Sequence, residues 1–202
     1  MGSEFVVYFR LGIEHIADIR GYDHILFIAA LTVAYSLLEW RRLLILVTAF
    51  TLGHSITLAL ATLGLVAVNA ALIEFLIPTT ILITSIFNIA DSRAASESVD
   101  GVRGKRHHMI LYVFAGCFGL IHGLGFSSFL RAILGDEESI VLPLFAFNVG
   151  LEIGQILIVA VLFGLSALLF KFAKVVRRDW LLIVSGATGG IAITLMLERL
   201  PG

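Results

Sequence analysis

Long apolar stretches alternate with short polar ones along almost the whole chain. Six of the apolar stretches are long enough to cross a hydrocarbon layer of about 30 Å as an α-helix, which needs roughly 20 residues. They are 22–40, 42–66, 70–91, 109–134, 140–172 and 179–199. The pattern therefore predicts an all-α fold, a polytopic membrane bundle of six transmembrane helices.

The segments outside these stretches are short. Segment 6–20 carries too many charges to cross a bilayer, and it is predicted as a short N-terminal helix at the membrane interface. The long polar stretch 92–108 is predicted as a surface loop. Residues 1–5, which read MGSEF, are interpreted as an expression-tag scar. We therefore expect a single transmembrane domain over 6–202.

The composition supports this class of protein and excludes others. Hydrophobic residues make up 59% of the chain and charged residues 14%, whereas about a quarter of the residues in soluble domains are charged. The net charge of -1 gives no basic surface for nucleic acid. The single cysteine, Cys117, cannot form an internal disulfide. A soluble enzyme and a disulfide-stapled secreted domain are therefore excluded.

The distribution of lysine and arginine predicts the orientation. Ten of the 14 basic residues lie in the loops that follow the first, third and fifth predicted spans. Because Lys and Arg are concentrated in cytoplasmic loops, we expect these loops to lie inside and both termini outside. We expect the protein in the inner (cell) membrane of a bacterium, where its partners include the lipid bilayer. Assembly into a homo-oligomer is left open.

Ionisable side chains are rare within the predicted spans, where each costs roughly 2.5–3.5 kcal/mol. The candidates are Asp23, His24, His54, Glu74, His122 and Glu152. With a helical rise of about 1.5 Å per residue, His54, His122 and Glu152 fall in one layer near the middle of the membrane. Imidazoles and carboxylates at one depth suit a borderline divalent cation. We therefore expect a divalent transition metal ion, with Ni, Co, Zn, Fe and Mn left open.

The predicted fifth span carries a polar stripe. Asn148, Glu152 and Gln155 are spaced by four and three residues, so they lie on one helical face. We expect Asn148 and Gln155 to orient the metal ligands through hydrogen bonds. Gly119 and Gly123 flank His122, and such small residues allow neighbouring helices to approach closely.

Two functions fit these residues. The first is a membrane permease for a divalent transition metal, with its binding site near the bilayer midplane. The second is a membrane-embedded metalloenzyme that acts on a lipid-like or small substrate from the outer side. A third possible function is that of a scaffold or sensor that binds metal only for its structure. The residues fit transport and metal-dependent catalysis equally well, and the scaffold or sensor is the least favoured of the three.

Several motifs resemble those of the HupE/UreJ family of small membrane proteins. They are GIEHI at 12–16, GYDHILF at 21–27, FTLGHSITL at 50–58, GLIHGLGF at 119–126 and FNVGLEIGQ at 147–155. The likeness spans nearly the whole chain. The resemblance implies a permease for nickel or cobalt. The family is regarded as acting beside hydrogenases and ureases. The resemblance also implies His15 as a further metal ligand, with Ser55 and Glu74 beside the ligands or along the pathway.

Overall fold

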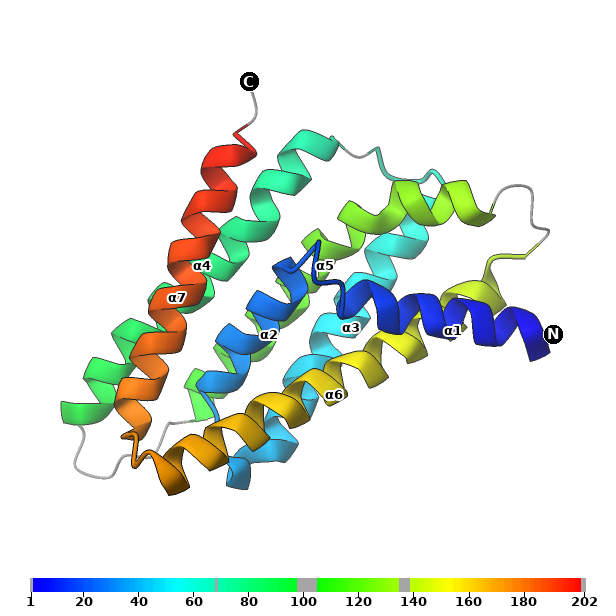
Figure 1. Ribbon diagram of the computed structural model, residues 1–202. Coiled ribbons are helices and arrows are strands. Elements are labelled where there is room, and N and C mark those ends of the chain that lie inside the picture. The colour runs from blue at the N-terminus through cyan, green and yellow to red at the C-terminus, as the bar shows by residue number, and fades with distance from the viewer. Residues whose placement is uncertain (1, 68, 98–104, 135–138, 201–202) are drawn as a thin grey trace.

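The computed structural model describes residues 2–67, 69–97, 105–134 and 139–200, which form helices joined by short connections (Figure 1). The α-helices are α1 (Gly2–Ile16), α2 (Asp23–Val33), α3 (Trp40–Thr62), α4 (Ala70–Glu97), α5 (Lys105–Leu134), α6 (Val141–Phe172) and α7 (Arg177–Glu198). A short 3-10 helix, η1 (Leu37–Glu39), precedes α3. These described residues contain no strand, which confirms the predicted all-α class.

Five of the described helices, α3 to α7, are long and apolar enough to cross a bilayer. The chain is therefore a multi-pass membrane protein. The predicted count of six spans is not confirmed, because the first predicted span, 22–40, is not one helix. Its regular part is α2, whose 11 residues extend only about 16 Å, roughly half of the hydrocarbon thickness.

A polar break separates α2 from α3. The Ser36 hydroxyl donates to the Glu39 carboxylate at 3.0 Å, and the Ser36 backbone N–H donates to the same carboxylate at 3.2 Å. This capping box marks the beginning of η1. The Arg177 guanidinium donates to the carbonyl oxygen of Ala34 at 3.3 Å. The hydropathy of 22–40 gave no sign of the break, because most of its residues are apolar.

The predicted short N-terminal helix over 6–20 is present as α1, which ends at Ile16 and packs lengthwise on α6 (Figure 1). The Phe5 ring lies 6.4 Å from that of Phe145, and Gly150 faces the backbone of Phe9. Residue numbers rise together along both helices, so the pair is parallel. A Cβ on Gly150 would overlap the carbonyl oxygen of Phe9. The glycine therefore permits a backbone contact that makes α1 part of the bundle.

Two further helix pairs complete the described bundle. In the pair α3 and α5, a Cβ on Gly53 or on Gly119 would overlap the backbone of the other helix. The antiparallel pair α4 and α7 is joined by a 2.9 Å hydrogen bond between the hydroxyls of Ser85 and Thr188. Figure 1 shows this pair at one flank, and α2 contacts α4, α6 and α7.

The predicted loop 92–108 is shorter than its polar sequence suggests. The helix α4 continues to Glu97 and α5 begins at Lys105, while 98–104 lie outside the described residues. A helix can continue into water after its apolar part ends, since its backbone hydrogen bonds are internal. Polar composition therefore marks the end of a span better than the end of a helix.

Candidate metal centre

Four histidine rings from four different helices meet inside the bundle. The ring centroid of His24 lies 4.6 Å from that of His15, 6.2 Å from that of His54 and 5.1 Å from that of His122. His24, His54 and His122 are buried, and His15 is half-buried. The helices α1, α2, α3 and α5 each contribute one of the four side chains.

Three of these side chains have the spacing of metal ligands. One nitrogen atom from each of His15, His24 and His54 lies within 4.8 Å of the other two. Nitrogen ligands that bind one zinc ion tetrahedrally at about 2.1 Å lie about 3–4 Å apart. The spacing of these three nitrogens is therefore close to that of the ligands of one metal ion.

The same rings carry nitrogen atoms that need a partner. Within the described part of the chain, the buried Nε2 atoms of His15, His24, His54 and His122 have no hydrogen-bond partner. Each such atom costs about 1–3 kcal/mol when it is removed from water. Bare imidazole nitrogens are ligands that nickel, cobalt and zinc bind well. The donor set therefore fits a borderline divalent metal ion.

His122 has one ring nitrogen fixed by the backbone. Its Nδ1 lies 2.8 Å from the carbonyl oxygen of Phe118. A carbonyl oxygen only accepts hydrogen bonds, so this contact assigns the ring proton to Nδ1. The assignment leaves Nε2 with its lone pair free to bind a metal, as in many histidine metal sites.

Aromatic side chains enclose the histidines. The ring centroid of Phe126 lies 3.9 Å from that of His15, and the Phe50 centroid lies 5.1 Å from that of His122. Phe147 lies 6.2 Å from His54 by the same measure. Such an apolar wall limits the access of water to the imidazole nitrogens, which strengthens their interaction with a cation.

A cavity of about 600 Å³ leads to the histidines. His15, His24 and His122 line it, together with four carboxylates and one guanidinium. These charged residues are Glu14, Asp18, Asp23, Glu74 and Arg199. An excess of carboxylates in a concave, partly apolar site raises the local concentration of cations. The cavity therefore has the charge expected of a route by which a cation reaches the rings.

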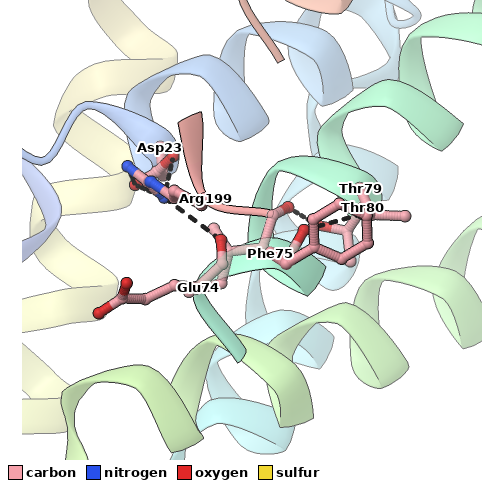
Figure 2. Close-up of polar contacts among 7 residues, drawn as sticks. Asp23, Glu74, Phe75, Thr79, Thr80 and Arg199 are labelled. Atoms are coloured by element: carbon pink, nitrogen blue, oxygen red, sulfur yellow. Dashed lines mark hydrogen bonds and ion pairs between the residues drawn. The ribbon is translucent and has the colours of Figure 1, made fainter. Parts of the chain in front are cut away.

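Figure 2 shows how the charged wall of this cavity is arranged. The Arg199 guanidinium contacts Asp23 Oδ2 at 3.2 Å through both terminal nitrogens, and it lies 3.5 Å from the carbonyl oxygen of Glu74. The Glu74 carboxylate points away from Arg199. Sequence reasoning missed Arg199, which stands at the end of the sixth predicted span. Arg199 is one of the few basic residues outside the basic loops, and this position could have marked it as a functional candidate.

Glu152 is held by a hydrogen bond to α3. Its Oε1 accepts a 2.7 Å hydrogen bond from the hydroxyl of Thr48 on α3. Thr48 precedes His54 by six residues, which is about 9 Å along the helix axis. The structure therefore brings together the four histidines among the six predicted ligands, while Asp23 pairs with Arg199 and Glu152 bonds to Thr48.

The remaining predicted residues connect α6 to α3 or bind their own helix. Gln155 accepts a 2.8 Å hydrogen bond from Thr51, and the Ser55 hydroxyl donates to the Thr51 carbonyl oxygen at 2.7 Å. The Asn148 amide donates to the carbonyl oxygen of Leu144 at 2.8 Å. Glu152 and Gln155 of the predicted polar stripe therefore bond α3, at Thr48 and Thr51, whereas Asn148 bonds its own helix.

The chain is similar to a known protein family. A family model described as HupE / UreJ protein matches residues 1–199, nearly the whole chain. No curated protein and no solved structure matches this chain.

Proposed function

Because the chain belongs to the HupE/UreJ family, we propose that it is a membrane permease for a divalent transition metal such as nickel or cobalt. The observation that carries the proposal is the group of buried imidazoles with unpartnered nitrogens at the base of an acidic cavity. The family resemblance adds nickel and cobalt as the first metals to test.

In the first step, the cavity captures the cation. The carboxylates of Asp23 and Glu74 attract the hydrated ion at the ends of α2 and α4. The imidazoles of His15, His24 and His54 then replace water molecules as ligands, and His122 is the fourth. Imidazole binds metal only in its neutral form, so binding displaces any proton held on the ligand nitrogens.

In the second step, Glu152 accepts the ion. Within the described residues, its Oε2 and the Oδ1 of Asn148 are buried without a hydrogen-bond partner. The two residues lie one helical turn apart on α6, and Glu152 is bonded to Thr48, about 9 Å before His54 along α3. Transport would run from the cavity towards the basic loops, which we place in the cytoplasm. The bacterial inner membrane is the proposed location.

The test combines metal content with flux. Purified protein in sealed liposomes that contain a fluorescent chelator is challenged with external Ni²⁺ or Co²⁺. We expect His54→Ala to lose both bound metal, measured by elemental analysis, and flux. His107→Ala, from the basic stretch before the apolar part of α5, is the matched control and keeps both. Equal flux in His54→Ala and wild type would contradict the proposal.

One observation favours the second candidate, a metalloenzyme. The cavity of about 600 Å³ is in the range of pockets that hold organic ligands, and Leu11, Ile77 and Phe129 give it apolar walls. An enzyme would keep tightly bound metal and show no flux in the liposome experiment. Metal that survives dialysis against a chelator, together with zero flux, would replace the permease proposal with this one.

A further inference from the structure

A second cavity lies at the opposite end of α2 from His24. Its volume is about 330 Å³, and it is bounded by α2, α6, α7 and the segment that leads into η1. It exists because α2 ends at Val33 while α6 and α7 continue. Its walls are mainly apolar side chains, among them Val33, Leu162, Phe163 and Val184. It shares no lining residue with the cavity at the metal centre.

Polar groups are concentrated on one part of this wall. Arg177, Trp180 and the hydroxyl residue Ser36 line the cavity where α7 begins. The side chain of Arg177 is 49% exposed. Its polar contacts within the described residues use only Nη2, which lies 3.3 Å from Ala34 O and 3.7 Å from Glu39 Oε2. The Nε and Nη1 donors therefore remain able to bind an anion.

The surroundings of Arg177 are strongly basic. Five further basic residues lie close in sequence to residues that line the cavity, whereas only two acidic residues do. The basic residues are Arg41, Arg42, Lys171, Lys174 and Arg178, and the acidic residues are Glu39 and Asp179. All five basic residues are exposed. Basic groups near a membrane surface attract anionic lipids, and basic pockets between membrane helices bind lipid head groups. Tryptophan is enriched at the same level of a bilayer, where its ring bridges apolar and polar regions.

A buried hydroxyl adds a second, independent sign of a ligand. Thr32 lines the cavity, its residue is only 4% exposed, and its Oγ1 has no hydrogen-bond partner within the described residues. A hydroxyl inside an apolar wall needs an acceptor. The ester oxygens of a phospholipid lie between its phosphate and its acyl chains, so one lipid offers groups for the arginine, the hydroxyl and the apolar wall.

We propose that this cavity binds one anionic phospholipid, with an acyl chain between α2, α6 and α7 and the phosphate on Arg177. A hydrocarbon gap left by a half-length helix would be filled by a lipid chain, which avoids an empty apolar space within the bilayer. The guanidinium can hold the phosphate through two parallel hydrogen bonds. Arg177 and the basic side chains around it favour a head group in which no cation balances the phosphate charge.

The experiment uses the two tryptophans of the chain. Trp40→Phe leaves Trp180 as the sole indole fluorophore, in the wall of the cavity. The protein is placed in phosphatidylcholine vesicles that contain brominated phosphatidylglycerol, and then in vesicles with brominated phosphatidylcholine. We expect the anionic lipid to quench Trp180 with about a fivefold higher relative binding constant, the scale of one basic residue near a membrane surface.

Two further variants separate the parts of the proposal. Arg177→Gln should remove the preference, whereas Arg178→Gln, the adjacent arginine outside the lining, should keep it. Ser166→Phe fills the apolar part and should reduce quenching by both lipids, with an unchanged helical circular dichroism spectrum as control. Equal quenching by the two lipids in the Trp40→Phe protein would overturn the head-group assignment. Quenching that Ser166→Phe leaves unchanged would place the acyl chain outside the cavity and overturn the site.

Discussion

Arg199 at the end of α7 holds both carboxylate oxygens of Asp23 at the start of α2, at 3.3 Å from Oδ1 and 3.2 Å from Oδ2. The two residues are 176 positions apart in the chain, and their side chains are 27% and 12% exposed. Asp23 directly precedes His24 and lines the acidic cavity. The guanidinium is therefore a cation fixed to the protein that competes with the metal ion for this carboxylate.

The first prediction follows from this pair. Arg199→Gln should raise the apparent affinity for Co²⁺ about fivefold, because it frees the Asp23 carboxylate to attract the cation. Arg20→Gln, an exposed arginine outside the cavity lining, is the control and should change little. Titration calorimetry in detergent measures both. In Asp23→Asn the gain from Arg199→Gln should vanish, and a gain that persists there would refute the assigned role of the pair.

The second prediction separates binding from passage at Glu152. The Glu152 carboxylate accepts a hydrogen bond from Thr48 and is not one of the clustered ligand groups. Glu152→Gln should therefore change equilibrium metal content little. It should reduce flux into liposomes about tenfold or more, since the accepting group loses its charge. Thr48→Val is the companion variant and should reduce flux less, because it removes only the hydrogen bond to Glu152. A loss of bound metal in Glu152→Gln equal to that in His54→Ala would make Glu152 a ligand of the histidine site.

The third prediction concerns the contact between α1 and α6. Gly150→Ala places a methyl group on the Phe9 carbonyl oxygen, so it should force the helices apart and displace His15. We expect a loss of about 1–3 kcal/mol of stability, as in other overpacked sites, together with lower metal content. Gly164→Ala on the same helix meets nothing within 4 Å and should be neutral or stabilising by up to about 1 kcal/mol. Thermal unfolding in detergent and elemental analysis measure the two effects.

The fourth prediction concerns orientation. In a Cys117→Ser background, Asp100→Cys should react with an impermeant maleimide only after the cells are permeabilised, because its loop carries many basic residues. Ser139→Cys, two residues before α6 in the next connection along the chain, should react in intact cells. The reverse labelling pattern would invert the topology and the direction proposed for transport.

The sequence alone predicted the class of the protein and much of its chemistry. Hydropathy is a property of each segment, so the lengths of apolar stretches were enough to predict α3 to α7 as long apolar helices. The helical rise placed His54 and His122 at one depth, because the distance along a helix follows from residue number. Motif resemblance pointed to the family that the comparison then showed.

The tertiary structure decided which of these residues meet. The parallel contact of α1 with α6, through Gly150, brings His15 to the other histidines, although segment 6–20 reads as a surface helix. Depth alone grouped Glu152 with the histidines, but the face of α6 that it occupies turns it to Thr48. At the break after α2, the hydrogen bond from Arg177 to Ala34 joins positions far apart in the chain, and so does the pairing of Arg199 with Asp23. Such choices depend on which helices pack together, and a one-dimensional pattern of apolar and polar residues contains no such information.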